Sequence, residues 1–266
     1  MTMRLHHLNC GTMHTPGEAI VCHVLLLETP TGLVLVDSGY GLADIASPGA
    51  RLGPARFMLK PALVEHETAI RQVAALGFDP ADVRDIVVTH FDIDHIGGIA
   101  DFPHARIHTT SAEVLGASTA PSWRERIRYS GAQWAHGPRL EEHIPDGDAW
   151  RGFAAAKELT DVAEGLVLVA LPGHTRGHAA VAVHAAGRWL LHAGDAFYHR
   201  GTLDPSVRVP RALALSERSI AFDRRQVVAN HERLRELHDR REPDIEIVSA
   251  HDGELLSRAT QRTAAG

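Results

Sequence analysis

Cysteine is scarce in this sequence, and its scarcity excludes several kinds of structure. Only Cys10 and Cys22 occur among the 266 residues. Two cysteines are too few for a disulfide framework or for a cysteine-based zinc site. We therefore expect both to be reduced thiols.

The sequence also lacks long apolar runs and concentrated positive charge. No run approaches the roughly 18 apolar residues that a membrane helix needs, and the opening MTMRLHHLNC lacks the apolar segment of a signal peptide. The formal net charge is −6, and Lys and Arg are spread along the chain, so neither nucleic acid nor a membrane is expected as a partner. These absences predict a soluble, cytoplasmic protein.

Hydrophobic patterning predicts alternating strands and helices in a single domain over residues 1–266. A β-hairpin is expected over 19–28 and 33–37. Further strands are predicted at 86–88, 166–171, 179–184, 189–192 and 245–249, and longer helices at 61–76 and 223–240. The pattern loosens between about 111 and 164, where we expect an insertion that caps a site.

Histidine is the residue type in excess, with 19 copies, and several histidines directly follow apolar strands. The strand-then-loop pattern recurs as VVTHFDIDHIGG (His90, Asp92, Asp94, His95), LVALPGHTRGH (His174), WLLHAGDAFY (Asp195) and IVSAHDG (His251). Strand ends are rigid, as the geometry of metal coordination requires. Buried His and Asp without partners would each cost several kcal/mol. Four such loops therefore indicate either a metal site or an extended polar network, and a metal site is the simpler interpretation.

These motifs resemble those of the metallo-β-lactamase superfamily. THFDIDHIGG resembles the HxHxDH signature, and LPGHTRGH, AGDA and AHD are similar to the later ligand motifs in the same order. Near the start, LETPTGLVLVDSGYG resembles the family's first hairpin, which places Asp37 beside the metal ligands. The resemblance implies an α/β (α+β) fold, a four-layer αββα sandwich of two mixed β-sheets flanked by helices, with a binuclear metal centre at one rim.

The resemblance also assigns roles to the motif residues. Two divalent metal ions are implied, zinc first, with a hydroxide that bridges them as the nucleophile. The first ion would be held by His90, Asp92 and His174, the second by Asp94, His95 and His251, with Asp195 bridging the two.

Asp92 departs from the family pattern, because relatives usually carry His at this position. A carboxylate is a harder ligand than imidazole and adds one negative charge. Both properties shift the preference of the first site from zinc toward iron or manganese, although Asp also binds zinc. Asp92 therefore makes iron or manganese the alternative cofactor.

Within the superfamily the chain most resembles the acyl-homoserine lactonase-like branch. The features are its single-domain length, the AHD ending at His251 and the AGDAFY segment, which places Tyr198 three residues after Asp195. This resemblance predicts hydrolysis of an ester or lactone in a small molecule with an apolar part. Tyr198 would stabilise the oxyanion, and Asp94 or water would protonate the leaving alkoxide.

Other functions stay open on the sequence. The alternatives are an iron-dependent oxidoreductase of the same fold, which Asp92 favours, a phosphodiester or thioester hydrolase, and a non-catalytic binding protein that contains metal. Assembly into a homodimer is also left open.

Overall fold

The first β-sheet is built largely from the N-terminal half of the chain. The computed structural model describes residues 3–15, 19–147 and 149–265. The sheet follows the chain order β1 (Arg4–His14), β2 (Ala19–Thr29), β3 (Gly32–Val36), β4 (Val83–Val87), β5 (Arg106–Thr110) and β6 (Arg139–His143). The first three strands are antiparallel, and β3 to β6 are parallel. The predicted hairpin is confirmed as β2 and β3, whereas β1 was not predicted from the sequence.

The second sheet is built from the C-terminal half. Its order is β11 (Ile245–Val248), β10 (Arg188–His192), β9 (Ala179–Ala185), β8 (Leu166–Ala170) and β7 (Ala156–Glu158). Strands β7 to β10 are antiparallel, and β11 is parallel to β10. Both sheets are therefore mixed, as expected.

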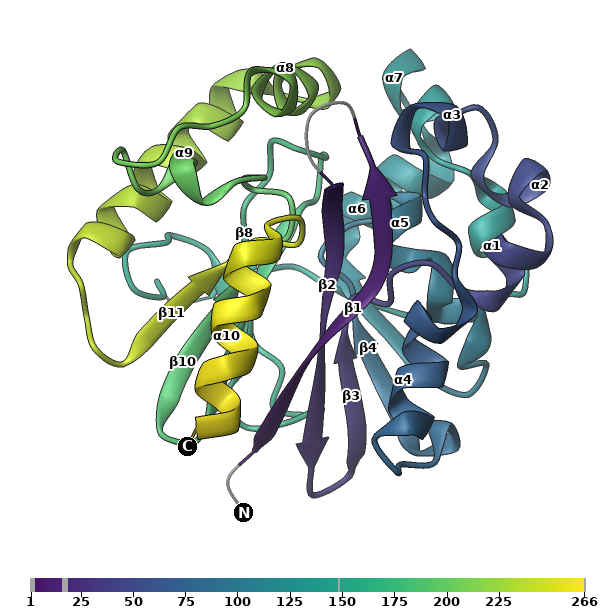
Figure 1. Ribbon diagram of the computed structural model, residues 1–266, viewed down its shortest axis with the longest axis horizontal. Coiled ribbons are helices and arrows are strands. Elements are labelled where there is room, and N and C mark those ends of the chain that lie inside the picture. Colours follow the sequence, from purple (N-terminus) through teal and green to yellow (C-terminus); the bar gives the residue numbers. More distant parts are fainter. Residues whose placement is uncertain (1–2, 16–18, 148, 266) are drawn as a thin grey trace.

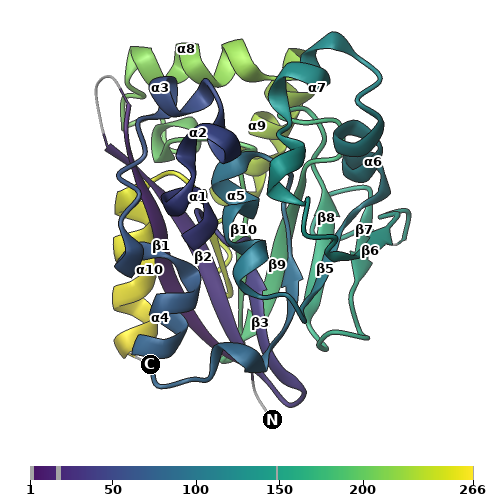
Figure 2. The same ribbon diagram turned by 90° about the vertical axis from the view of Figure 1, so that its right-hand side faces the viewer.

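The two sheets pack face to face, and helices cover the outer faces (Figures 1 and 2). Between the sheets, Leu25 and Val36 of the first sheet belong to the same buried cluster as Leu168 and Val181 of the second. The helices are α1 (Leu42–Ala46), α2 (Pro48–Leu52), α3 (Ala55–Leu59), α4 (Ala69–Ala75), α5 (Ile93–Ile96), α6 (Ser111–Val114), α7 (Trp123–Arg128), α8 (Arg211–Ile220), α9 (Arg224–Asp239) and α10 (Gly253–Ala265). The predicted four-layer sandwich is confirmed.

Two helices show where the sequence pattern was a good guide and where it was not. Helix α9 matches its prediction, and the Asp223 side chain caps it by accepting from two backbone N–H groups. The helix predicted over 61–76 forms only from Ala69, because Leu63 has a positive φ of 51° and residues Glu65–Glu67 form a 3₁₀ turn. A left-handed residue cannot continue an α-helix.

The segment 111–164, expected to be a capping insertion, has two structural roles. Its first part forms α6 and α7, and α7 lies at the end of the molecule where α3 and α8 also lie (Figure 2). Its second part supplies the edge strands β6 and β7, one for each sheet. These strands escaped prediction because β6, RLEEH, is mostly exposed and charged, and β7 has only three residues.

In the part of the chain that the structure describes, no helix combines the length and the apolar character needed to cross a membrane.

Candidate metal centre

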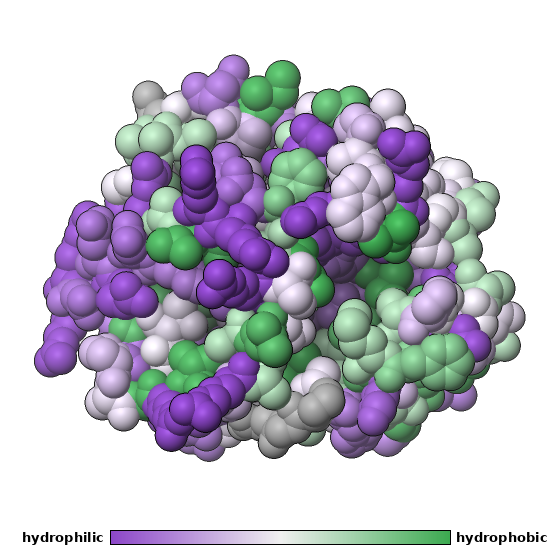
Figure 3. Space-filling model, turned by 90° about the horizontal axis from the view of Figure 1, so that it is seen from above, coloured by the Kyte–Doolittle hydropathy of each residue, from purple (hydrophilic) through white to green (hydrophobic). Residues whose placement is uncertain are grey.

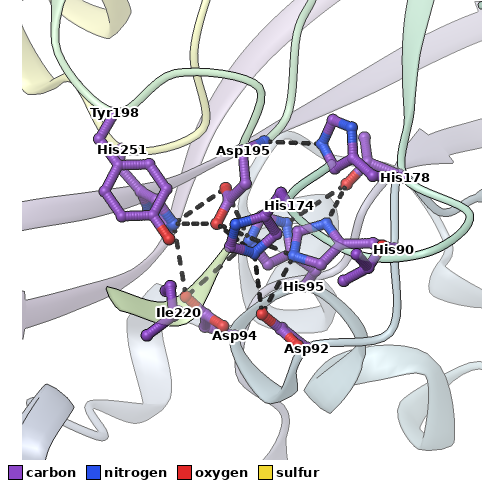
Figure 4. A network of polar contacts seen from close by, with 12 residues as sticks. His90, Asp92, Asp94, His95, His174, His178, Asp195, Tyr198, Ile220 and His251 are labelled. Carbon is purple, nitrogen blue, oxygen red and sulfur yellow. Dashed lines mark hydrogen bonds and ion pairs between the residues drawn. The ribbon is translucent and has the colours of Figure 1, made fainter. Parts of the chain in front are cut away.

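The candidate ligands come together at one edge of the sandwich because strands of both sheets end there. His90 and α5 follow β4, His174 lies between β8 and β9, Asp195 follows β10, and His251 follows β11. The parallel pairs β3–β4 and β10–β11 bring their carboxyl ends to the same edge. All seven residues predicted as metal ligands therefore lie in one cluster, in which Asp92 is partly exposed and the other six are buried (Figure 4).

One group of donors contains His90, Asp92, His174 and Asp195. Oδ2 of Asp92 lies 3.4 Å from Nε2 of His90 and 3.0 Å from Nε2 of His174. Oδ2 of Asp195 lies 3.3 Å from Nε2 of His174 and 3.8 Å from Nε2 of His90. The four donor atoms thus surround one point.

A second group contains Asp94, His95 and His251. Nε2 of His251 lies 3.5 Å from Oδ2 of Asp94, and Nε2 of His95 lies 3.9 Å from the same oxygen. Oδ1 of Asp195 faces this group, at 3.2 Å from Nε2 of His95 and 3.0 Å from Nε2 of His251. The two oxygens of one carboxylate therefore face two different donor groups.

These spacings fit divalent metal ions. Metal–ligand distances of about 2.1 Å in tetrahedral geometry place ligand atoms roughly 3.4 Å apart, which lies within the range of separations in both groups. Among the residues that the structure describes, the buried Nε2 atoms of His90 and His95 and Oδ1 of Asp195 also have no hydrogen-bond partner. Buried polar atoms are nearly always satisfied, so these three atoms point to a ligand. Imidazole and carboxylate are the donors that zinc, iron and manganese accept.

Neighbouring groups orient the ligands. Nδ1 of His95 lies 2.8 Å from Oδ2 of Asp37, and Nδ1 of His251 lies 2.8 Å from the Val21 carbonyl. Such bonds fix the tautomer and leave Nε2 free for a metal. His178 accepts a hydrogen bond from the backbone N–H of Asp195 at 2.9 Å. Asp37 and His178 therefore orient candidate ligands, and Asp37 lies beside them as expected from the sequence.

Gly194 allows this approach of His178 to the Asp195 loop. Its φ is +53°, and a Cβ at this position would lie only 2.7 Å from Nε2 of His178. A side chain here would therefore collide with the residue that orients Asp195.

Arg128, at the end of α7, is a partner of Asp92 that sequence reasoning missed. Its Nε and Nη2 lie 2.6 and 2.5 Å from the two oxygens of Asp92. Its Nη1 donates to the carbonyls of His174 and Ile220, and Nη2 lies 2.5 Å from Nε2 of His174. The guanidinium thus joins the first motif, the His174 loop and the end of α8.

Arg128 changes the electrostatics of the Asp92 position. Burial opposes a charge on Asp92, but the Arg128 guanidinium, together with His90 and His174, outweighs it, and these groups hold the pKa of this carboxyl well below its ordinary value. Asp92 is therefore an anion with its own counter-ion. The negative charge of Asp92 was one of two reasons to expect iron or manganese in the first site. Arg128 offsets this charge, so the hardness of the carboxylate ligand is the reason that remains.

Glu113 is a second residue that the sequence did not reveal. It is fully buried and accepts hydrogen bonds from the N–H of Phe91, the hydroxyl of Tyr129, the hydroxyl of Thr175 and the N–H of Gly177. The carboxylate therefore connects the loop after His90, the loop after His174 and the segment that carries Arg128. Neither Arg128 nor Glu113 stands in a recognisable motif. The sequence signal for Arg128 was Asp92 itself, because a carboxylate in place of the usual His calls for a cation nearby.

A cavity of about 650 Å³ leads to this cluster. Asp92, Asp94, Asp195 and His251 line its inner end, and its walls are mostly apolar, including Met13, Ile20, Ile93, Leu213 and Ile220. A hollow is visible at this end of the molecule in the space-filling view (Figure 3). A substrate with an apolar part could therefore reach both donor groups.

Tyr198 lies beside the second donor group. Its ring centroid lies 5.1 Å from that of His251, and its side chain lines the cavity (Figure 4). Burial and then the charge of Asp195 raise the pKa of Tyr198 well above its ordinary value, so its hydroxyl keeps its proton and can donate a hydrogen bond.

Comparisons with known proteins identify the family of this chain. A probable metallo-hydrolase of Mycobacterium tuberculosis is 58% identical over 257 residues, which cover 97% of this chain and 83% of the relative. An N-acyl homoserine lactonase of Rhizobium johnstonii is 31% identical over 211 residues, covering 76% of this chain and 73% of the relative. A structure of a variant of the Bacillus thuringiensis protein AiiA, with N-decanoyl-L-homoserine bound at its active site, superposes with a TM-score of 0.67 at 22% identity and covers 96% of this chain and 95% of that one. The sequence profile of the metallo-beta-lactamase superfamily matches residues 17–247, and the chain belongs to this superfamily.

Proposed function

We propose that this protein is a metal-dependent hydrolase of esters or lactones that carry an apolar group. The observation that carries the proposal is the placement of Asp195, whose two oxygens face separate donor groups at the inner end of an apolar cavity. In this proposal His90, Asp92 and His174 hold one divalent ion, Asp94, His95 and His251 hold another, and Asp195 is shared. Zinc is the first candidate, with iron or manganese as the alternatives that Asp92 favours.

Bound divalent ions would supply a water nucleophile that is ionised at neutral pH and would polarise the carbonyl of the substrate. The protein's own residues contribute positioning and proton transfer. Apolar walls at Ile93, Leu213 and Ile220 hold the apolar group and exclude water around it. The Tyr198 hydroxyl donates a hydrogen bond to the carbonyl oxygen as negative charge develops on it. Asp94 takes up the proton that the water nucleophile loses and delivers it to the departing alkoxide.

The names of the relatives support an ester or lactone as the substrate. The R. johnstonii relative is named an N-acyl homoserine lactonase, and the AiiA structure contains a decanoyl homoserine. A lactone with an acyl chain matches the two features that the site offers: its ester carbonyl would react near the donors, and its apolar chain would lie in the cavity.

The test measures metal content and hydrolysis on the same preparation. Protein purified without added metal is analysed for zinc, iron and manganese, then assayed with acyl lactones, carboxyl esters, thioesters and phosphodiesters before and after chelation. We expect lactone or ester hydrolysis that chelation abolishes and added metal restores. Metal-loaded protein that hydrolyses phosphodiesters alone, or that consumes oxygen instead, would overturn the proposal.

A control variant separates loss of metal from loss of fold. His251→Gln removes one donor of the second group, whereas His136→Gln changes an exposed histidine outside both groups. Only the first change is expected to lower metal content and activity.

A further inference from the structure

The mouth of the cavity lies between three short helices that are distant in sequence. Residues of α3, α7 and α8 all line the cavity, and both ribbon views place these helices at the same end of the molecule (Figures 1 and 2). We use the name cavity rim for the exposed large apolar and basic residues of these helices and of the α3 C-cap: Phe57, Met58, Lys60, Trp123, Arg124, Arg126, Ile127, Arg211, Leu215 and Arg218.

The cavity rim holds large apolar side chains in water. Phe57, Met58, Trp123, Ile127 and Leu215 are between 58% and 75% exposed. They are five of the nine large hydrophobic residues that are exposed in the described part of the chain. Exposed apolar residues gathered around one opening indicate a surface that meets an apolar partner.

The charges of the cavity rim are all positive, although the chain as a whole carries a net charge of −6. Lys60, Arg124, Arg126, Arg211 and Arg218 are exposed. The acidic residues of the three fully described helices are Glu125 and Glu217, and both are buried. Glu125 is also paired with Arg176, outside the cavity rim. The exposed surface of these helices therefore presents cations without exposed anions.

Helical spacing places the apolar and the basic residues of the cavity rim side by side. On α8, Arg211, Leu215 and Arg218 follow at intervals of four and three, which puts them on one stripe. On α7, Trp123 and Ile127 are four residues apart with Arg126 between them. Apolar side chains interspersed with Lys and Arg are the composition of surfaces that lie at a membrane interface.

Aromatic and basic side chains also pair on the cavity rim. The Arg124 guanidinium lies 5.7 Å from the Trp123 ring centroid. A tryptophan with an adjacent cation suits the boundary between lipid headgroups and acyl chains, where one part of the pair is apolar and the other is solvated.

We propose that the cavity rim docks onto an anionic lipid surface, with the cavity opening toward the bilayer. Anionic headgroups would bind the Lys and Arg side chains, and the exposed apolar residues would enter the outer acyl region. A second copy of the chain fits this surface less well, because a symmetric contact would place cation against cation. Docking itself does not depend on the proposed hydrolase activity. If that activity holds, an apolar substrate would pass from the bilayer directly into the cavity.

The test measures partition of the complete protein onto vesicles, by co-sedimentation and by the emission of Trp123. Vesicles contain either phosphatidylcholine alone or equal parts of phosphatidylcholine and phosphatidylglycerol. We expect at least tenfold stronger partition onto the anionic vesicles, a blue shift of tryptophan emission that Trp123→Phe removes, and weakening by salt at about 0.5 M.

Matched pairs of variants locate the surface. Arg126→Glu with Arg218→Glu should weaken partition by about tenfold or more, because each basic residue near the surface contributes roughly a fivefold effect. Phe57→Ser with Ile127→Ser should weaken it on both kinds of vesicle. The controls lie elsewhere: Arg84→Glu with Arg188→Glu near the amino ends of β4 and β10, and Leu76→Ser with Ile144→Ser for exposed apolar residues. Thermal melting verifies that each variant is folded.

The outcomes decide the proposal. Partition that is stronger on anionic vesicles and is lost in the cavity-rim variants but not in the controls supports it. Equal partition onto both vesicles, or equal losses in both sets of variants, overturns it. Absence of vesicle binding, together with a dimer that the cavity-rim variants dissociate, overturns it in favour of a contact between two copies.

Discussion

The pairing of Arg128 with Asp92 gives the sharpest test of how this centre differs from its relatives. We expect Arg128→Met to destabilise the metal-free protein and, at the same time, to strengthen metal binding by the first donor group. The two effects have one cause, because the guanidinium shares Oδ2 of Asp92 and Nε2 of His174 with that group. Removing it leaves an anion without a partner in the metal-free state and frees both donor atoms for a cation.

The size of the first effect follows from the contacts. Arg128 makes two hydrogen bonds to Asp92 and two to backbone carbonyls. Removing one partner of a buried ion pair costs about 3–5 kcal/mol. Both side chains are 16% exposed, so water screens part of their charge. We therefore expect the free energy of unfolding to fall by about 3 kcal/mol, the lower end of this range.

A double-mutant cycle isolates the interaction. Asp92→His alone restores the usual family residue but places an imidazole against a buried cation, so we expect a similar loss of about 3 kcal/mol. The double variant removes both charges, so its free energy of unfolding should fall by no more than that of either single variant. This gives a coupling free energy of about 3 kcal/mol between the two residues. The free energy of unfolding is measured by urea denaturation after chelation, and metal affinity by competition with a chelator followed by elemental analysis.

Arg126→Met is the matched control, because Arg126 lies in the same helix and is exposed. It should change the free energy of unfolding by less than about 0.5 kcal/mol. A coupling below about 0.5 kcal/mol between Asp92 and Arg128, or weaker metal binding in Arg128→Met, would refute the reasoning.

Three further changes test other parts of the centre. Tyr198→Phe should lower kcat for ester or lactone hydrolysis by about a hundredfold and leave metal content unchanged, because the ring still packs; steady-state kinetics that show no change would contradict its role as a donor. Gly194→Ala should cost about 2 kcal/mol and weaken metal retention, since its Cβ would meet His178; urea denaturation and metal analysis measure both, and an unaffected variant would show that the loop relaxes freely. The hydrogen bond from Arg176 lowers the pKa of Glu125 from 4.5 to about 2, so this pair stabilises the fold above pH 4.5 and loses its effect as the pH falls toward 2. Glu125→Gln should therefore reduce the loss of stability of metal-free protein across that interval, and an unchanged pH profile would argue against the pair.

The candidate ligands could be predicted from the sequence because each stands in a short, ordered motif after an apolar strand. The apolar run of a strand of four to seven residues shows where the strand ends, and this locates the residues that follow it. His174, Asp195 and His251 were located in this way, and the four-layer fold followed from the family resemblance. The prediction of a helix over 61–76 was wrong in its first half for a local reason. Leu63 has a left-handed backbone conformation, which apolar periodicity does not reveal.

The supporting residues could not be predicted, because their partners are distant in sequence and their own surroundings carry no motif. Arg128 is 36 residues from Asp92, and Glu113 is 62 residues from Thr175. Both lie in the stretch whose pattern is loosest, 111–164. Only a folded chain shows that this stretch brings a counter-ion to Asp92 and also contributes an edge strand to each sheet.

The sequence by itself determined which candidate metal donors the chain carries, because the types of donor and their order along the chain are local properties. Tertiary structure decided how the charges are arranged, because electrostatics depends on distance in space. Lys and Arg are dispersed along the chain and gave no reason to expect a basic surface. Folding gathers those of α3, α7 and α8 around one apolar opening, and it places Arg128 against Asp92.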